Sequence, residues 1–414
     1  MADTAHRYFT EVYAASKENL KIWDIDLYGP LLIVNPITRQ AYANYPDSAG
    51  ILKKDKNIYT GKLPGNILIG NASLDWGGRR WAMVLTFFLN HADLKDRVDL
   101  FLHELFHRVQ PSLGFANLKE LPNDHLDKRE GRIYLRLELE ALKKALTARA
   151  TEERRLHVKH ALQFRAYRYQ LYPGALETEG SVEINEGMAS YTGKAARQLG
   201  DKELVELLCL KIDSFFRQKN YVKLFAYETV PAYGFLLRDT DPYWNKKVNK
   251  QTNLTHFFGE ALRNGLQDHT ITQGEIEATA DLYGGKYIAG QETDREETMK
   301  KIVAGYKRRF LEQPHFELAF TGKKSISSDS RLMVSIEDLG RVNPSMKIIA
   351  DWGILDIKET GGFLTPNLDK VIITVPLKTE KNIVSGDGWV LTVNPGYEVV
   401  REEKSGNYFL VKLK

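Results

Sequence analysis

Two histidines and a glutamate stand close together in the segment His103-Glu104-Leu105-Phe106-His107. On an α-helix, side chains four residues apart lie one above the other on the same face, so His103 and His107 can turn ring nitrogens toward one metal ion. Glu104 would reach a water bound to that metal. Because imidazole is a preferred ligand of zinc, the segment predicts two ligands and the general base of a catalytic zinc site.

The surrounding residues predict that this segment lies on a buried helix. Apolar side chains recur at helical spacing in a wide stripe, and Pro111 follows, a residue that ends helices. The stripe consists of Val98, Phe101, Leu102, Leu105, Phe106 and Val109. Polar groups on a buried helix need partners, because an unpartnered polar group in the interior costs free energy. A bound metal ion would be such a partner for the two imidazoles.

A third protein ligand is expected elsewhere, because a catalytic zinc ion usually takes three protein ligands and one water. A second core-facing helix is predicted around residues 181–195, where apolar side chains again recur at helical spacing and Gly200 follows. A glutamate inside such a helix needs a cation. Glu186, followed by the small Gly187, suits a close approach to the first helix, and Glu183, one turn earlier, is the alternative ligand.

Together the two segments resemble the gluzincin zinc metallopeptidases, most closely the M1 aminopeptidase-like branch. The resemblance is carried by Phe101 to His107 and by Ile184-Asn185-Glu186-Gly187-Met188-Ala189-Ser190-Tyr191, a pattern of the form HExxH…NEGxASY. It implies a thermolysin-like or zincin-like catalytic domain with one zinc ion per chain. It also implies that His103, His107 and Glu186 are the metal ligands, with Glu104 as general base.

The resemblance further implies a tyrosine that hydrogen-bonds the oxyanion of the reaction intermediate. The segment Tyr227-Glu228-Thr229-Val230 is similar to the Tyr-x-x-Gly segment of the family, with valine in place of the glycine. Tyr227 is then a catalytic residue, and Tyr233 is the alternative.

The predicted strands upstream of the first motif bear on substrate choice. In zincin folds the strand before the histidine helix is an edge strand that pairs with extended substrate, and Trp81 to Phe88 occupies that position. The alternative is an ordinary core strand beside that helix. Residues 71–78 stand where M1 aminopeptidases have a Gly-x-Met-Glu-Asn motif, whose glutamate binds the free amine of the substrate. Leu74 falls at the position of that glutamate, and Asp75 is next to it. We therefore expect internal or N-blocked peptide bonds to be cut at least as well as N-terminal ones.

The pattern along the chain predicts an α+β protein with two domains. Residues 1–315 are expected to form the catalytic domain, with a mixed sheet and a helical bundle, and a helical hairpin inserted at about residues 130–175. Insertions whose ends lie close together cost little free energy, so the hairpin is compatible with the zinc site and is expected to wall one side of it. Spaced β runs between turn residues predict an all-β domain over residues 316–414.

Composition narrows the function classes. The 58 basic and 54 acidic residues give a net charge of +4, and no basic cluster alternates with aromatic residues, so nothing indicates nucleic-acid binding. The chain has no apolar run long enough for a membrane span, and its first residues lack the apolar centre of a signal peptide. As written the sequence indicates a cytoplasmic protein, with an exported protein shown without its leader as the alternative. It does not indicate an oligomeric state.

The sequence thus favours a zinc metallopeptidase with a peptide or protein substrate. The alternatives are a zinc hydrolase acting on a non-peptide amide, and a non-enzymatic binding protein on a peptidase-like scaffold. The carboxylate of Glu104 argues against the last, because a structural zinc site has no use for a base beside it.

Overall fold

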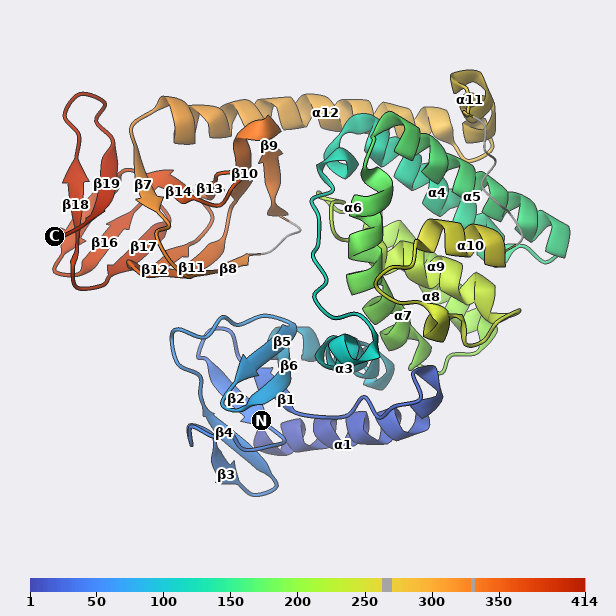
Figure 1. Cartoon of the computed structure of the whole chain (residues 1–414), viewed down its shortest axis with the longest axis horizontal. Coiled ribbons are helices and arrows are strands. Elements are labelled where there is room, and N and C mark those ends of the chain that lie inside the picture. Colours follow the sequence, from blue (N-terminus) through green and yellow to red (C-terminus); the bar gives the residue numbers. More distant parts are fainter. Residues whose placement is uncertain (263–269, 329–331, 414) are drawn as a thin grey trace. The chain divides into compact units, whose positions relative to one another are not determined.

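A computed structural model describes residues 1–262, 270–328 and 332–413 as a chain of mixed α and β structure (Figure 1). The parts of the two predicted domains that fall on residues 263–269 and 329–331 and on Lys414 lie outside the described residues. The chain divides into two compact units, one of Met1–Pro64 and Ile69–Gly290, the other of Gly65–Leu68 and Gln291–Lys414. This division falls within a long helix, whereas the sequence placed the domain boundary at residue 315, where the strands of the second unit begin.

The first unit contains a six-stranded sheet in the order β3-β4-β2-β1-β6-β5. Strands β1 and β6 are parallel and the other neighbours are antiparallel. The strands are β1 (Leu31–Val34), β2 (Gln40–Ala43), β3 (Lys53–Asp55), β4 (Ile58–Lys62), β5 (Ala72–Trp76) and β6 (Arg79–Leu85). Leu31, Ile33, Ala82 and Val84 alternate along β1 and β6 and join the core that the helices of this unit cover, as period-two patterning requires.

Of the two expectations for Trp81 to Phe88, the edge strand was wrong and the alternative, a strand inside the sheet, is confirmed. β6 lies inside the sheet, it ends at Leu85, and the edge strand is β5. The reason is the turn Gly77–Gly78, where φ is 54° and 73°, the left-handed region that a two-residue hairpin needs and that glycine adopts without strain. This hairpin folds β5 back along the outer side of β6.

Helices make up the rest of the first unit (Figure 1). Helix α3 packs against β6 and β5, and helices α4 and α5 lie side by side as the hairpin expected from the sequence. The α-helices are α1 (Ala2–Glu18), α2 (Thr86–Leu89), α3 (Leu94–Val109), α4 (Arg129–Thr147), α5 (Thr151–Leu171), α6 (Ala175–Val182), α7 (Met188–Ala195), α8 (Asp201–Phe215), α9 (Ala226–Arg238), α10 (Leu254–Ala261) and α11 (Gln273–Asp281), and α12 (Gly285–Lys307) continues into the second unit. A π-helical turn, η4 (Glu183–Gly187), joins α6 to α7.

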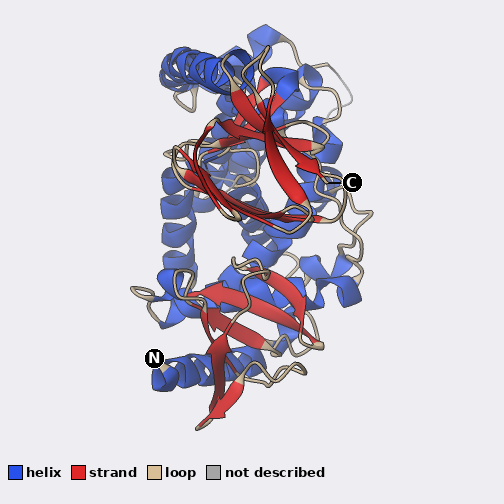
Figure 2. Ribbon diagram, turned by 90° about the vertical axis from the view of Figure 1, so that its left-hand side faces the viewer, coloured by secondary structure: helices blue, strands red, loops and turns tan. Residues whose placement is uncertain are grey.

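The second unit contains two layers of mainly antiparallel strands, with one cluster of buried apolar residues between the layers and a smaller one around Phe310 (Figure 2). One sheet has the order β18-β19-β7-β14-β13-β10-β9, in which β19 and β7 are parallel, and the other has the order β15-β16-β17-β12-β11-β8. The strands are β7 (His315–Ala319), β8 (Lys324–Ser328), β9 (Val334–Ile336), β10 (Gly340–Asn343), β11 (Met346–Ala350), β12 (Gly353–Ile357), β13 (Gly362–Leu364), β14 (Lys370–Thr374), β15 (Pro376–Glu380), β16 (Ile383–Gly386), β17 (Trp389–Val393), β18 (Tyr397–Arg401) and β19 (Tyr408–Lys412).

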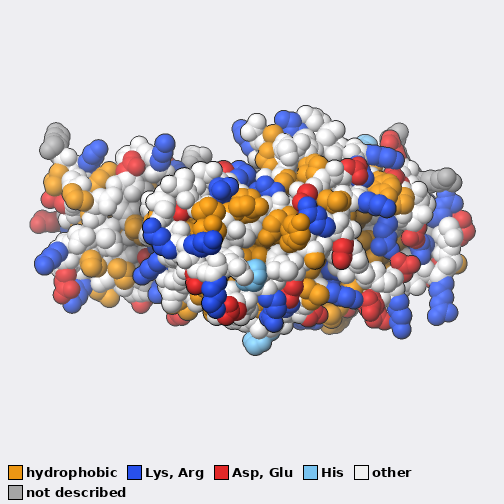
Figure 3. All heavy atoms as spheres, turned by 90° about the horizontal axis from the view of Figure 1, so that it is seen from below, with side chains coloured by type: hydrophobic (Ala, Val, Ile, Leu, Met, Phe, Trp, Pro, Cys, Tyr) orange, Lys and Arg blue, Asp and Glu red, His pale blue; other side chains and the backbone are white. Residues whose placement is uncertain are grey.

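The surface carries charges of both signs. On the face drawn in Figure 3, lysine and arginine side chains are interspersed with aspartate and glutamate. None of the helices in the described part of the chain combines the length and apolar character that a membrane crossing requires.

Candidate metal centre

Helix α3 places the first motif inside the first unit. The helix begins after Asp93, whose carboxylate accepts a hydrogen bond from the backbone N–H of Asp96 at 2.7 Å, and it ends at Val109, two residues before Pro111. His103 and Glu104 are buried, with 7% and 4% of their surfaces exposed. The helix predicted from the apolar stripe is therefore present.

The second motif lies on the π-helical turn η4 and on α7, which packs against α3. Gly193 allows this approach, because a Cβ atom on it would lie 2.3 Å from Oδ1 of Asp99 on α3. Gly187, which the sequence placed against the histidine helix, faces α9 instead, where a Cβ atom would lie 2.4 Å from Cγ2 of Val230. The sequence predicted a continuous helix here and missed the π turn, a wider turn that often occurs at functional sites.

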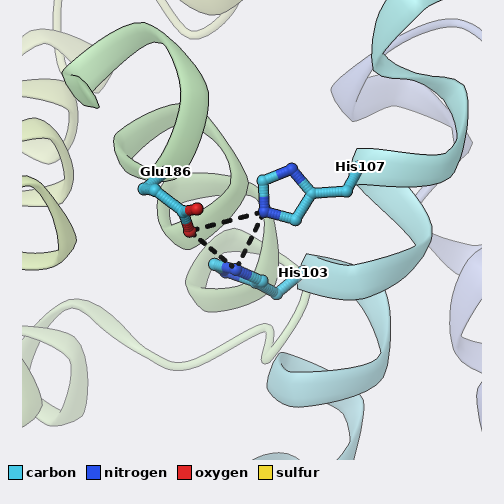
Figure 4. Close-up of side chains that lie close together, drawn as sticks. All are labelled: His103, His107 and Glu186. Carbon is cyan, nitrogen blue, oxygen red and sulfur yellow. Dashed lines mark hydrogen bonds and ion pairs between the residues drawn. The ribbon is translucent and has the colours of Figure 1, made fainter. Parts of the chain in front are cut away.

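Three side chains from α3 and η4 point toward one another (Figure 4). The Nε2 atoms of His103 and His107 are 3.2 Å apart, and Oε2 of Glu186 lies 3.6 Å and 3.5 Å from them. Ligands held about 2.0–2.1 Å from a tetrahedral zinc ion are separated by about 3.3 Å. The three atoms therefore have the spacing of a zinc ligand set without further movement.

The tautomer of His107 suits a metal ligand. Nε2 of Gln110 lies 3.3 Å and 3.2 Å from the carbonyl oxygens of Ile184 and Asn185, to which it donates. The Oε1 atom of Gln110 therefore faces Nδ1 of His107, at 2.9 Å, and accepts a hydrogen bond from its N–H. Nδ1 of His107 thus donates to Gln110, and Nε2, which points at the ligand cluster, is the atom that would give up its proton to bind a metal ion, an arrangement that supports metal-binding histidines.

The carboxylate of Glu186 is buried among cations. Its Oε1 atom lies 2.9 Å from Nζ of Lys223, which also lies 3.1 Å from a carboxylate oxygen of Glu120. Burial alone would raise the pKa of Glu186, but hydrogen bonds from the two histidines and the charges of His107 and Lys223 hold it well below its usual range. Burial would lower the pKa of His107, yet Glu186 raises it to about 9. The cluster thus holds an anionic oxygen and attracts positive charge.

Glu104 lies beside the cluster as a carboxyl group in need of a partner. Its Oε2 atom is shielded from solvent and has no hydrogen-bond partner among the residues that the structure describes. Burial raises the pKa of Glu104, and the charges of His103 and His107 oppose that rise. A buried oxygen without a partner fits a group that holds a water or a proton during a reaction.

The structure brings Tyr227, and not Tyr233, to the cluster. The hydroxyl of Tyr227 donates to Oε2 of Glu186, and its ring stacks on that of His103 with centroids 5.4 Å apart. Burial and the charge of Glu186 raise the pKa of Tyr227 well above its usual value, so the hydroxyl keeps its proton. Tyr233 is fully buried and donates instead to Oε1 of Glu138, 3.1 Å away.

The alternative ligand Glu183 is occupied elsewhere. Its two carboxylate oxygens lie 2.7 Å and 3.1 Å from the guanidinium of Arg165, and it is fully buried. In the wider π turn, residues three apart do not share a face as they would on an α-helix, so Glu183 and Glu186 point to different neighbours.

The possible amine anchors on β5 are not part of the cluster. Asp75 is exposed and pairs with Arg80 on β6, with 2.8 Å between Oδ2 and Nη1. Leu74 pairs with Trp81 across the same two strands. Sequence reasoning missed Gln110 and Lys223 as neighbours of the cluster. Gln110 could have been found from its position three residues after His107 at the end of the helix. The sequence holds no comparable signal for Lys223.

Comparison of the chain with protein-family models, with curated proteins and with solved structures gives no match.

Proposed function

We propose that the protein is a zinc-dependent metallopeptidase of the gluzincin type, with a zincin-like catalytic unit. The observation that carries the proposal is the convergence of His103, His107 and Glu186 at the spacing of zinc ligands, beside the buried carboxyl of Glu104. The resemblance of the two motifs to gluzincins supports it. The sheet with α3 against it and the antiparallel edge strand β5 also fit such a fold.

Zinc held by the three ligands would lower the pKa of a coordinated water to about 7 and polarise the carbonyl of the scissile bond. The residues of the chain supply the rest. Glu104 takes the proton of the attacking water and passes it to the leaving amine. Tyr227, whose hydroxyl keeps its proton and donates to Glu186 in the free protein, would turn that hydrogen bond to the oxyanion that forms.

The substrate that we propose is an internal or N-blocked peptide bond of an extended segment. A free amino terminus needs an anionic partner in the site, because an unpaired ammonium group costs binding energy. Asp75, the acidic residue closest to the expected anchor position, is paired with Arg80. Strand β5 offers its free edge for pairing with extended substrate.

A peptide library read by mass spectrometry tests the proposal. Wild-type protein should cut internal bonds, lose this activity with a chelator and regain it with zinc. Glu104→Gln keeps the size of the side chain but cannot accept a proton, so zinc should stay bound while turnover falls by about 10²–10⁴-fold.

Other results of the same experiment would contradict parts of the proposed function. Unchanged turnover in Glu104→Gln would remove this residue from the mechanism. Zinc binding without any peptide cleavage would favour a hydrolase of a non-peptide amide or a non-enzymatic binding protein. Strict removal of single N-terminal residues, lost in Asp75→Asn, would show that Asp75 is the amine anchor.

A further inference from the structure

A network of fully buried charges lies behind the metal-ligand turn. Its members share complete burial of their side chains and come from four consecutive helical elements. They are Glu138 on α4, Arg165 and Arg168 on α5, Glu179 on α6, and Glu183 on η4. His125 adds a nitrogen 2.8 Å from Oε1 of Glu179.

A gain in stability does not by itself explain such a network of buried charges. Moving charges out of water costs several kcal/mol per ion, and replacing a buried ion pair by apolar residues of similar volume is often neutral or stabilising. Buried ionic groups are better explained where they select one arrangement of the elements that carry them. The question is therefore which arrangement this network selects.

Glu183 is the member of the network that lies on the same π turn as the candidate metal ligand Glu186. It accepts two hydrogen bonds from Arg165, in which Nη1 donates to Oε2 and Nη2 donates to Oε1 of the carboxylate. It accepts a third from the hydroxyl of Thr229 on α9, at 2.6 Å. Three donors from two different helices fix the side chain of Glu183 in place.

The backbone of Glu183 closes the turn that holds the metal ligand. Its carbonyl accepts a hydrogen bond from the N–H of Met188, five residues on, which is the π-helical bond that makes the turn wide. Glu186 lies inside the loop that this bond closes. Gln110 braces the same loop from α3, through the carbonyls of Ile184 and Asn185.

We infer that Arg165 is a positioning residue of the metal centre, which acts by clamping Glu183 and thereby the π turn that presents Glu186 to the two histidines. The inference rests on the proposed zinc site. It gives the inserted hairpin a role beyond walling the site, because α5 supplies the guanidinium that fixes the third ligand. Thr229 links the same clamp to α9, two residues after Tyr227.

The test is the zinc dissociation constant, measured by competition with a chromophoric chelator. Arg165→Met should raise it about 10–100-fold, the usual effect of losing a residue that orients a ligand. The visible spectrum of the Co²⁺-substituted protein should change too, because the ligand set is disturbed. Arg168→Met is the matched control. It removes a buried arginine of the same helix that bonds Glu179 and Glu138, so it should lower the urea midpoint but leave zinc affinity and the Co²⁺ spectrum near those of wild type.

Equal zinc affinity in Arg165→Met and wild type would overturn the inference. It would also be overturned if both arginine variants lost zinc affinity in proportion to their loss of stability. If Arg165→Met does not fold, Thr229→Val removes one donor to Glu183 and should raise the dissociation constant by about 3–10-fold, and unchanged affinity in that variant would overturn the inference. A wild-type protein that binds no zinc would overturn the proposed function itself. If the wild type and all variants bind zinc equally tightly, the proposed zinc site stands and only the positioning role of Arg165 is contradicted.

Discussion

The Nζ atom of Lys223 lies 2.9 Å from Oε1 of Glu186, while Oε2 of the same carboxylate faces the Nε2 atoms of both histidines. The two oxygens of one side chain thus have different partners. Lys223 is itself held 3.1 Å from a carboxylate oxygen of Glu120, and Oε1 of Glu120 accepts a hydrogen bond from Asn185 at 2.6 Å. This chain of contacts orients Glu186 so that a single oxygen faces the two histidines.

Lys223→Met should therefore weaken zinc binding. The variant keeps most of the side-chain volume but leaves Oε1 of Glu186 without its cation, so we expect the zinc dissociation constant to rise about 10–100-fold. Competition with a chelator measures it. Lys250→Met, which removes a lysine bonded to the backbone carbonyl of Ala116 in the same unit, is the control and should behave as wild type. Equal affinities in the two variants would show that Lys223 does not orient the ligand.

Tyr227→Phe should lower turnover without releasing the metal. Loss of one donor to a developing oxyanion typically costs about 10²–10³-fold in kcat. At saturating zinc the content should stay at about one ion per chain, because the variant keeps all three ligands and the ring that stacks on His103. Tyr233→Phe is the comparison, since Tyr233 bonds Glu138 outside the cluster and its loss should affect stability more than turnover. The reverse ranking in steady-state kinetics would make Tyr233 the better candidate.

Gly187→Ala should destabilise the protein. The added methyl group would meet Val230 at 2.4 Å and the carbonyl oxygen of Ala226 at 3.0 Å, so η4 and α9 must move apart, at a cost of about 1–3 kcal/mol. Gly180→Ala on α6 is the matched control, with nothing within 4 Å of the new atom, and it should be stabilising by up to about 1 kcal/mol through helix propensity. Urea unfolding measures both. A harmless Gly187→Ala would contradict the close packing described for this turn.

Glu228 should give the stability of the protein a distinct pH dependence. Burial raises the pKa of this half-buried carboxyl from 4.5 to about 7, against the charges of Lys194 and Lys211. Because the folded state binds the proton more tightly than the unfolded chain, the contribution of Glu228 is fully present below pH 4.5 and is lost as the pH rises to about 7.

Glu228→Gln removes this dependence. At pH 8 the variant should be more stable than wild type by at most about 3 kcal/mol, and at pH 4 the two should be nearly equal. Urea unfolding of both proteins at each pH checks this, since other titrating groups cancel in the comparison. A difference that is the same at both pH values would show that Glu228 does not titrate in this range.

The sequence predicted the elements of the site better than their connections. The apolar stripe of α3 is a strong helical signal, and the two histidines four apart follow directly from it. Spacing alone could not decide between Glu183 and Glu186, because they lie on a π turn that contacts Arg165, Thr229 and Gln110 from distant parts of the chain.

The order of the strands in the first sheet was also not predicted correctly from the sequence. The alternating pattern of β6 indicates a strand but not its place in the sheet, and the edge assignment failed because β5 was not recognised as a strand. The signal was present in Gly77–Gly78, since two adjacent glycines between β-rich segments favour a tight hairpin. Lys223, in contrast, lies on a connecting segment with no local pattern, and its proximity to Glu186 follows from the fold alone.

Zinc content per chain tests the central claim most directly. Protein dialysed against zinc-buffered solution and then analysed by mass spectrometry for metal should carry about one zinc ion in the wild type. His103→Ala and Glu186→Gln should lose it, while Glu104→Gln should retain it. A wild type that stays free of metal under these conditions, or a Glu186→Gln variant with the zinc content and affinity of wild type, would contradict the assignment of these residues as a zinc site.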